Sequence, residues 1–387
     1  MDDCNVRRFG AAGDGVSDDT AAFARALDAA GAAGGGVVQV PTGNYALRGR
    51  LAIPENVTLE GVFRAPTART QYKGSTLLAY AGAGDEDGEP FLFLHANSVV
   101  KGLTVFYPEQ DRTRPHPYPW CIRGHGDNCS VLDVLLVNPY QAVDFGTLPS
   151  GRHLVRGLYA QPLHKGLFVD QCYDAGRIED VHFWPFWSES LRSWTETSAI
   201  GFIFGRTDWE YVVNCFCIFY RTGFLFREFD HGPGNVLLLN SGSDIGPRAV
   251  HVEKVMAHAG IAFSNCQFMA GIEVSPENEG PVKFNNCGFW GTDGTGFHAD
   301  IRGTGAVSFH QCHFTHWDRK EAGQPAIRCA GRALSVIGCE FMDATHRQVV
   351  LEEESGPAIL TGNRMAGGVR IEAKGSAMHI IRDNLPG

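Results

Sequence analysis

The stretch FSNCQFMA at residues 263–270 decides the fold, because near-copies of it recur along the second half of the chain. FNNCGFWG follows at residues 284–291 and FHQCHFTH at residues 309–316. At intervals of 21 to 27 residues, the fourth position of successive copies is held by Cys215, Ser241, Cys266, Cys287, Cys312, Cys339 and Asn363. Such a period is typical of one structural unit stacked on copies of itself.

Each copy contains a bend. Its apolar residues stand at the first, fourth and sixth positions, as in Phe263, Cys266 and Phe268. A strand would place them two residues apart, so the gap of three predicts a corner at the intervening position. That position is asparagine in four copies, at Asn214, Asn240, Asn265 and Asn286. Asparagine tolerates the left-handed backbone that a sharp corner can require.

A second apolar motif follows the first in each unit, as in GLFVD from Gly166, GIEVS from Gly271 and GFHAD from Gly296. Its second and fourth positions are apolar, and this alternation predicts a half-buried strand. In GFHAD the inward positions would be Phe297 and Ala299. Each coil then reads strand, bend, strand, loop, strand, with like residues stacked about 4.8 Å apart. We predict an all-β protein, a right-handed parallel β-helix or solenoid with a continuous core.

One helical pattern interrupts this reading. Asp18, Asp19 and Thr20 precede the amphipathic stretch AAFARALDAA at residues 21–30. Acidic residues favour a helix start, and a solenoid needs its exposed end covered. We therefore predict an N-terminal capping helix. No linker interrupts the repeats, so residues 1–387 are expected to form a single β-helix domain, with an opening module and cap at 1–65 and stacked coils at 90–387.

The composition narrows the possible functions. The chain has 387 residues, a formal net charge of −10 and 11 cysteines. The negative charge argues against a nucleic-acid partner, and no apolar run is long enough to span a membrane. Most cysteines fall in the inward column, where thiols act as small core residues. MDDCNVRR at the start has no apolar core of a signal peptide, so we expect a cytoplasmic protein, or a secreted one whose leader is absent from this sequence.

The first 65 residues resemble the opening module of the pectate-lyase-like β-helix superfamily, which includes polygalacturonase-related glycoside hydrolases, polysaccharide lyases and phage tailspike enzymes. The resemblance rests on FGA from Phe9, GDG from Gly13, DDT from Asp18, VPTG from Val40 and on Tyr45. It implies a carbohydrate substrate and leaves the reaction open, because the N-T-D and R-I-K motifs of the superfamily's polygalacturonases are missing. It also implies a possible homotrimer, since such β-helices often associate along their sides.

The leading functional hypothesis is a glycoside hydrolase that uses two carboxylates in a groove on the outer face of the β-helix. The first alternative is a polysaccharide lyase acting on a uronate-containing glycan, which needs a cationic groove. The second alternative is a non-catalytic glycan-binding β-helix. We expect an oligo- or polysaccharide partner, and neither a cofactor nor a metal ion.

Loop length and aromatic content suggest where the groove lies. The connections at residues 106–119, 184–198 and 315–325 are long, and the second lies within the stretch FWPFWSESLRSWTETSA at residues 183–199. The tryptophans that could stack on sugar rings are Trp184, Trp187, Trp194 and Trp209. Exposed aromatic clusters mark binding surfaces. The alternatives are a small core that folds the loop onto the body, and a subunit contact.

Acidic residues fall on the same coils. The candidate catalytic carboxylates are Asp170, Asp208, Glu228 and Asp230, and the expected substrate-binding groups are Arg206, Arg227, His231 and Glu196. Alignment of the coils puts Asp208 and Asp230 in one column, and neighbouring coils approach the roughly 5 to 5.5 Å carboxylate separation of a retaining glycosidase. The alternative is that these residues form ordinary ion pairs at solvent-facing turns.

A second outward column is predicted nearer the C-terminus. It contains His251, Glu273, His298 and Arg328, with Glu253 and Asp300 beside it. Histidine and carboxylate together could bind a metal ion or transfer protons. The alternative is a polar stripe on a solvated face or in a subunit interface.

Overall fold

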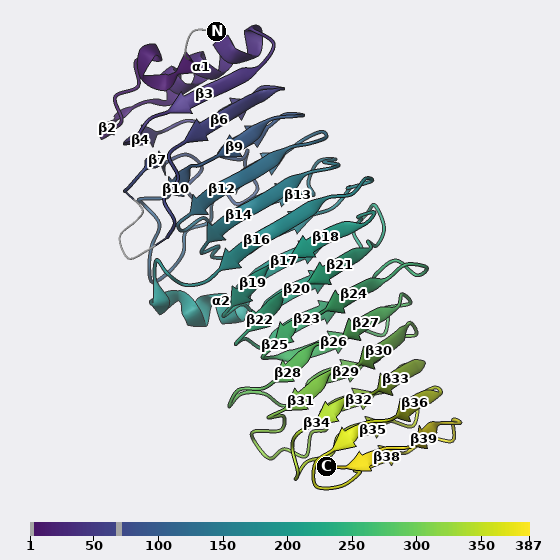
Figure 1. Cartoon of the computed structure of the whole chain (residues 1–387). Coiled ribbons are helices and arrows are strands. Elements are labelled where there is room, and N and C mark those ends of the chain that lie inside the picture. Colours follow the sequence, from purple (N-terminus) through teal and green to yellow (C-terminus); the bar gives the residue numbers. More distant parts are fainter. Residues whose placement is uncertain (1–3, 67–71) are drawn as a thin grey trace. The chain divides into compact units, whose positions relative to one another are not determined.

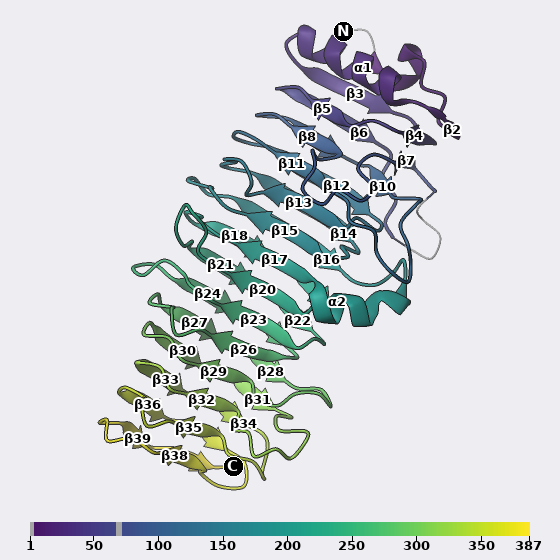
Figure 2. The same cartoon turned by 180° about the vertical axis from the view of Figure 1, so that it is seen from behind.

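The computed structural model describes residues 4–66 and 72–387, and the chain divides into two compact units, Met1–Ile203 (unit 1) and Phe204–Gly387 (unit 2). Within each unit, strands of successive coils pair in parallel and in register. Figures 1 and 2 show them as stacked rungs. Each coil contributes to two sheets. Sheet I carries the bent first motif and sheet II carries the second motif.

Unit 1 builds sheet I from β1 (Cys4–Asn5), β2 (Asp14–Asp18), β3 (Gly36–Val40), β4 (Gly43–Leu47), β6 (Val57–Gly61), β7 (Ser75–Ala79), β9 (Val99–Lys101), β10 (Thr104–Phe106), β12 (Ser130–Leu136), β14 (Leu154–Ala160) and β16 (Arg177–Phe183). Its sheet II consists of β5 (Leu51–Ile53), β8 (Leu92–Leu94), β11 (Trp120–Gly124), β13 (Gln141–Phe145) and β15 (Lys165–Val169). The short helices η1 (Val6–Phe9), η2 (Glu189–Leu191) and α2 (Arg192–Ser198) lie outside the sheets. The boundary between the units falls within β17 (Ile200–Phe204).

Unit 2 builds sheet I from β18 (Glu210–Val213), β19 (Phe216–Ile218), β21 (Val236–Leu239), β22 (Gly242–Asp244), β24 (Ile261–Ser264), β25 (Gln267–Phe268), β27 (Val282–Asn285), β28 (Gly288–Trp290), β30 (Ala306–His310), β31 (His313–Thr315), β33 (Ala333–Ile337), β34 (Glu340–Phe341), β36 (Ala358–Thr361), β37 (Arg364–Met365), β39 (Ile380–Arg382) and β40 (Leu385–Pro386). Its sheet II consists of β20 (Thr222–Phe226), β23 (Arg248–Val252), β26 (Gly271–Val274), β29 (Ala299–Ile301), β32 (Ile327–Cys329), β35 (Val349–Leu351) and β38 (Ile371–Ala373).

The predicted bends are confirmed in unit 2. All four column asparagines have left-handed backbone, with φ between 51° and 55°. Their side chains form a ladder, since the amide of Asn240 donates to Asn214 at 3.3 Å and that of Asn265 donates to Asn240 at 2.7 Å. Asn286 donates to Asn265 at 3.4 Å. Asparagine therefore stabilises the bend in two ways. It tolerates positive φ, and its side-chain amide forms a hydrogen bond to the neighbouring coil.

The predicted inward columns form the core of unit 2. The cysteines of the fourth position are buried and have no disulfide partners. Burial raises the pKa of the Cys217 thiol to about 12. Phenylalanines stack between coils, with the rings of Phe263 and Phe284 4.8 Å apart and those of Phe284 and Phe309 5.0 Å apart. Thiols and stacked rings thus fill the interior at the spacing of the coils.

One inward pair differs from the prediction. β29 pairs with β26 so that Ala299 faces Ile272 and Ile301 faces Val274. The inward residues of this coil are therefore Ala299 and Ile301, and Phe297 lies in the preceding loop, half-buried. The predicted strand began two residues too early because GFHAD has the same pattern of small and apolar residues as the second motif of the other coils, whereas β29 begins at Ala299.

Helix α1 (Thr20–Ala32) forms where a helix was predicted, and Figure 1 shows it beside β3; its role as a cap stays a prediction. Its apolar face, which includes Phe23 and Leu27, is buried. Asp19 accepts hydrogen bonds from the backbone N–H groups of Ala12 and Gly13 at 2.6 and 3.1 Å, which ties the opening turn to the helix start. Neither α-helix in the described ranges has the length and hydropathy of a membrane span.

Candidate active site

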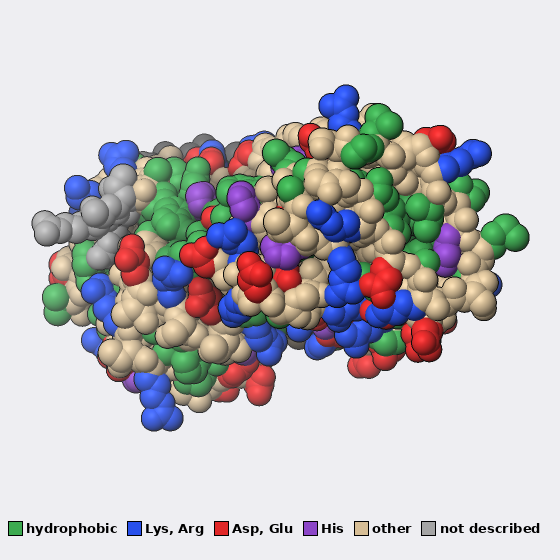
Figure 3. All heavy atoms as spheres, turned by 90° about the horizontal axis from the view of Figure 1, so that it is seen from below, with side chains coloured by type: hydrophobic (Ala, Val, Ile, Leu, Met, Phe, Trp, Pro, Cys, Tyr) green, Lys and Arg blue, Asp and Glu red, His purple; other side chains and the backbone are tan. Residues whose placement is uncertain are grey.

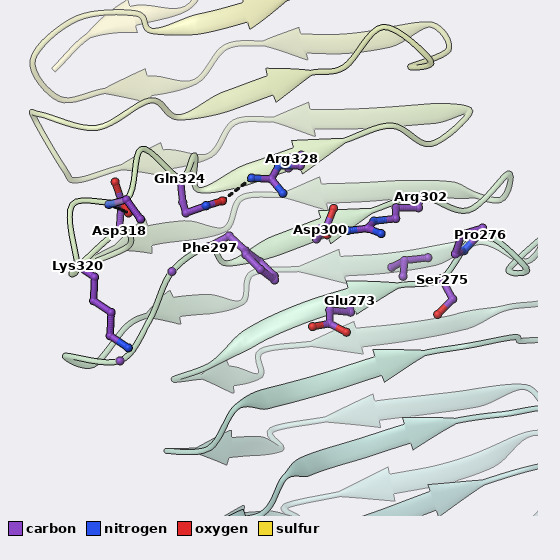
Figure 4. Close-up of a pocket in the computed structure, with 14 residues that line it drawn as sticks. Glu273, Ser275, Pro276, Phe297, Asp300, Arg302, Asp318, Lys320, Gln324 and Arg328 are labelled. Carbon is purple, nitrogen blue, oxygen red and sulfur yellow. Dashed lines mark hydrogen bonds and ion pairs between the residues drawn. The ribbon is translucent and has the colours of Figure 1, made fainter. Parts of the chain in front are cut away.

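A pocket opens on the outward face of sheet II in unit 2, over strands β26, β29 and β32 (Figure 4). The register places Glu273, Asp300 and Arg328 side by side on three successive coils. Their strand neighbours, such as Ile272 and Val274, point into the core, so alternation sends these three side chains outward. The pocket has a volume of about 540 Å³, within the roughly 300–1,000 Å³ of small-ligand sites.

The pocket walls are formed by two loops, at residues 291–298 and 316–326, and by the turn at Ser275 and Pro276. The loop at residues 316–326 carries Lys320 and Gln324, and a buried carboxylate holds it in shape. Asp318 accepts hydrogen bonds from the backbone N–H groups of Ala322 and Gly323 at 2.9 and 2.8 Å. The predicted long connection at residues 315–325 therefore does become a wall of a pocket. Figure 4 shows Lys320 at the outer end of this loop and Ser275 on the opposite side.

Two of the carboxylates that line the pocket, Glu273 and Asp300, are each paired with a guanidinium. Arg248 lies 2.8 Å from Glu273, and Arg302 lies 2.7 Å from Asp300. Arg328 hydrogen-bonds Gln324 and lies 3.7 Å from Glu352. Asp300 is 7% exposed and lies at the base of the site. The pocket combines two acids that could transfer protons with cations that could hold a negatively charged ligand.

His251 precedes Glu273 in the same column and extends the site by one coil. Its Nδ1 lies 2.7 Å from Arg248 and its Nε2 lies 3.0 Å from the Ser275 hydroxyl. Arginine can only donate, so Nδ1 must accept and the proton sits on Nε2. Burial lowers the pKa of His251 to about 4, and the charge of Arg248 adds to this. The imidazole is therefore neutral near pH 7.

Unit 1 contains a second group of titratable side chains where two strands of its sheet II begin: Tyr140 directly precedes β13, His164 directly precedes β15, and Glu86 lies in the loop before β8. Glu86 lies 3.0 Å from the Lys165 ammonium and 3.5 Å from the His164 imidazole. The rings of Tyr140 and His164 are 5.0 Å apart. Burial, followed by the charge of Glu86, raises the pKa of Tyr140 to about 12. A protonated phenol, an imidazole and an ammonium thus gather around one carboxylate, a set suited to proton transfer.

Comparison with known proteins supports the fold. The family described as Rhamnogalacturonase A/epimerase, pectate lyase-like matches residues 4–116. The solved A-module of Azotobacter vinelandii Mannuronan C-5 epimerase AlgE4 has a TM-score of 0.60 at 16% identity and covers 98% of this chain and 99% of the module. The chain has the pectate-lyase-like right-handed parallel β-helix fold. The resemblance expected from the opening residues is confirmed.

Two further comparisons show how far the likeness extends. Pre-mature bacteriophage phi29 gene product 12 has a TM-score of 0.66 at 13% identity and covers 94% of this chain and 52% of that one. Mannuronan C5-epimerase AlgE1 of Azotobacter vinelandii is 47% identical over 81 residues, which is 19% of this chain and 6% of that protein. The chain thus matches less than a tenth of the length of AlgE1.

The aromatic loop at residues 184–198 packs against other residues of unit 1, to which it belongs. Phe186 and Trp187 lie against a buried apolar cluster on sheet I that contains Leu78, Phe106, Leu135 and Val137. The Trp194 indole donates to the Leu163 carbonyl at 2.9 Å, and the Trp184 ring lies 4.7 Å from that of Phe186. The three predicted tryptophans of this loop are half-buried, as the loop-core alternative requires. A role in substrate binding stays a prediction for them.

The predicted catalytic acids occupy different surroundings. Asp170 in unit 1 is buried directly after β15. In unit 2, Asp208 lies 3.0 Å from Arg206, and Glu228 lies 2.5 Å from Lys254. Asp230 is exposed after β20. The ion pairs agree with the alternative of ordinary turn charges, and the catalytic assignment of these four acids stays a prediction.

The predicted binding groups follow the same pattern. Arg227 forms an ion pair with Glu253 at 2.6 Å, and Glu196 lies 3.6 Å from Arg192 on α2. His231 is exposed in the turn after β20, and Trp209 is 63% exposed. Trp209 is thus the one tryptophan of the predicted set with an open ring face. Its assignment as a sugar platform stays a prediction.

The second predicted column is correct for three residues and wrong for His298. His251, Glu273 and Arg328 share the outward column, but the position between the last two belongs to Asp300. His298 is buried, and its Nε2 lies 2.9 Å from the Thr315 carbonyl oxygen. Because the expected register was two residues early, Asp300 was placed beside the column. The run Ala299-Asp300-Ile301, an acid between two apolar residues, is the signal that identifies it.

Proposed function

We propose that this β-helix is a carbohydrate-active enzyme that hydrolyses glycosidic bonds in an acidic polysaccharide, in the pocket over β26, β29 and β32. The observation that carries the proposal is that Glu273 and Asp300 are register partners in one pocket. Paired strands lie about 4.8 Å apart, so side chains on them can bring two carboxyl groups to the roughly 5 to 5.5 Å separation of retaining glycosidases. One carboxyl group would protonate the leaving oxygen, and the other would attack the anomeric carbon or activate water.

The cations of the pocket support an acidic substrate. Arg302, Arg328 and Lys320 line it, and guanidinium groups bind carboxylates in two-pronged fashion. The net charge of −10 would repel a polyanion at long range, but local fields dominate at contact distance. The matched relatives include proteins named for mannuronan, a polysaccharide. A chain of uronate sugars is therefore the substrate class that we propose.

A panel of neutral and acidic polysaccharides tests this function when two products are read together. Hydrolysis yields new reducing ends without the ultraviolet absorbance of an unsaturated uronate, and this is the expected result on an acidic polymer. Absorbance that rises with the reducing ends would reject hydrolysis in favour of elimination. On the active polymer, Asp208→Asn and Asp230→Asn test the acids predicted from the sequence: loss of activity in a folded variant would place the reaction at these acids, and retained activity in both would favour the pocket over β26, β29 and β32.

The cluster in unit 1 supports a second candidate function, proton abstraction next to a uronate carboxylate, as in a lyase or an epimerase. Its basis is the convergence of Tyr140, His164 and Lys165 on Glu86. The imidazole would take the proton next to the carboxylate, and the ammonium would stabilise the charge that develops there. In an epimerase the phenol would return a proton to the same carbon from the other face; in a lyase it would protonate the leaving glycosidic oxygen as that C–O bond breaks. Neither elimination nor epimerisation is a hydrolysis, so water does not cleave the glycosidic bond.

Tyr140→Phe separates the two candidates. It removes the phenol proton and keeps the ring that contacts His164. If the second candidate holds, the variant loses unsaturated product or, for an epimerase, the exchange of sugar protons with deuterated water. If the pocket in unit 2 carries the reaction, Tyr140→Phe leaves the release of reducing ends unchanged.

A further inference from the structure

A second hollow of about 560 Å³ lies on sheet I of unit 2, over β19, β22, β25 and β28. It belongs to a different sheet from the candidate active site and shares no lining residue with it. Its floor is low because Gly242 and Gly288 present no side chain on either side of Gln267. A Cβ on Gly288 would lie 2.3 Å from the Gln267 side-chain oxygen, so the glycine makes room for that amide.

An oriented tryptophan forms one wall of this hollow. Trp290 on β28 is 39% exposed, and its indole N–H donates to the Gln267 side-chain oxygen at 3.0 Å. That hydrogen bond fixes the ring at the rim, with apolar surface turned to solvent. The flat face of an indole suits the apolar C–H face of a pyranose ring, and rigid aromatic side chains lose little entropy when they bind.

Polar groups complete the lining. The amides of Asn240 and Asn265 belong to the asparagine ladder, and each amide retains hydrogen-bonding capacity beyond its ladder bonds. On β22, Asp244 accepts the Ile245 backbone N–H through one oxygen at 2.7 Å. Within the described residues, the structure records no ion pair of Asp244 with lysine or arginine. Sugar hydroxyls can donate to its other oxygen.

The charge of the residues that line the hollow favours a neutral sugar over an acidic one. Among the described residues, its lining contains no lysine, arginine or histidine and one carboxylate, Asp244. The candidate active site, by contrast, is lined by Arg302, Arg328 and Lys320. A uronate chain would meet an uncompensated negative charge in the hollow, whereas a neutral sugar would meet only hydrogen-bonding groups and an aromatic wall.

We propose that this hollow is a separate, non-catalytic binding site for a neutral oligosaccharide. A pyranose ring stacks on Trp290, and its hydroxyl groups donate to Asp244 and accept from the Gln267 amide. The site does not depend on the reaction carried out in the other pocket. It would hold a neutral stretch of a polysaccharide, or a neutral branch, against the side of unit 2.

Isothermal titration calorimetry with defined hexasaccharides tests the proposal. The neutral probes are cellohexaose, maltohexaose, mannohexaose and galactohexaose, and the acidic probe is hexagalacturonate. We expect at least one neutral probe to bind with Kd below about 1 mM, an affinity of about 4 kcal/mol. Trp290→Ala should weaken that binding by about tenfold or more. Tyr72→Ala removes another exposed aromatic ring, 53% exposed in unit 1, and should leave the affinity unchanged.

Asp244→Asn tests the charge argument. The amide retains the size of the carboxylate and loses its charge, so hexagalacturonate should bind the variant more tightly than it binds the native protein. Thermal unfolding confirms that each variant is folded. The proposal is overturned if every neutral probe fails to bind, if Trp290→Ala binds as the native protein does, or if hexagalacturonate is the ligand that depends on Trp290.

Discussion

Glu273 and Asp300 lie side by side on two adjacent coils, and each is held by a guanidinium, at 2.8 Å from Arg248 and 2.7 Å from Arg302. A parallel β-helix creates this relationship without a dedicated loop, because its outward columns bring residues 27 positions apart in the sequence to the strand spacing. Charges of both signs are interspersed on the molecular face drawn in Figure 3. What distinguishes the pair is that the two acids line the candidate active-site pocket from neighbouring strands.

His251 contributes to the pH dependence of stability, together with His298, whose pKa burial also lowers to about 4. Burial lowers the pKa of His251 in the folded protein to about 4, against roughly 6.5 for an unperturbed histidine. The unfolded chain therefore binds the proton first, so stability is fully present above about pH 6.5 and falls as the pH drops toward 4. We expect His251→Gln to reduce this pH dependence, measured by urea unfolding at pH 7, 5.5 and 4.5. An unchanged dependence would contradict the assignment.

The wall loop at residues 316–326 should respond to Asp318. Asp318→Ala removes the acceptor of two backbone N–H groups, and each unpaired donor costs about 1–3 kcal/mol. We expect the loop to loosen and KM to rise roughly tenfold, while kcat changes by less than about threefold, because the reacting acids are untouched. Asp318→Asn, which keeps one acceptor, should show a smaller rise. A fall in kcat with constant KM would contradict the claim that this loop forms a wall of the binding pocket.

We expect the stability of variants at the asparagine ladder to depend on the left-handed backbone of the corner. Asn265 has φ 55° and bonds to its neighbours on both sides. Asn265→Gly removes the ladder bonds and tolerates the left-handed backbone, whereas Asn265→Ala removes the bonds and strains it by about 1–2 kcal/mol. The alanine variant should therefore unfold more easily than the glycine variant in denaturant. Equal stabilities would show that the corner carries no strain.

The aromatic loop should behave as core and not as a binding wall. Trp187→Ala removes a half-buried ring that packs against the apolar cluster on sheet I, and it should lower the free energy of unfolding by about 1–3 kcal/mol. Trp209 is exposed, so Trp209→Ala should change stability by no more than about 0.5 kcal/mol. Denaturant unfolding measures both. A stable Trp187→Ala protein with a raised KM would instead restore the sugar-binding hypothesis for this loop.

The fold was predictable because its periodicity is written in residue types that allow few alternatives. A cysteine column with an adjacent asparagine column specifies a buried strand next to a left-handed corner, and Asn214, Asn240, Asn265 and Asn286 all adopt it. The opening residues from Phe9 to Tyr45 indicated which superfamily of β-helices the chain resembles. The division into two compact units at residue 203 had no counterpart in the repeat pattern. The expectation of one domain over residues 1–387 stays a prediction.

The site was harder to predict because it depends on register and on loop conformation. An error of two residues placed Phe297 in the core and moved Asp300 off its column. The aromatic loop looked exposed because composition does not reveal whether Phe186 and Trp187 cover an apolar patch. Leu78 and Leu135, which they cover, lie on outward positions far away in the sequence. No local pattern links the two segments.

The measurement that tests the account most directly is turnover by Glu273→Gln and Asp300→Asn on the acidic polysaccharide that the native protein cleaves. Glu354→Gln, an exposed acid outside the pocket lining, is the matched control. We predict that each pocket variant loses at least about 100-fold in kcat, the usual loss when a general acid or base is removed, with thermal unfolding and the control unchanged. Release of reducing ends at more than about a tenth of the native rate by either folded variant would contradict the claim that this carboxylate pair carries out the reaction.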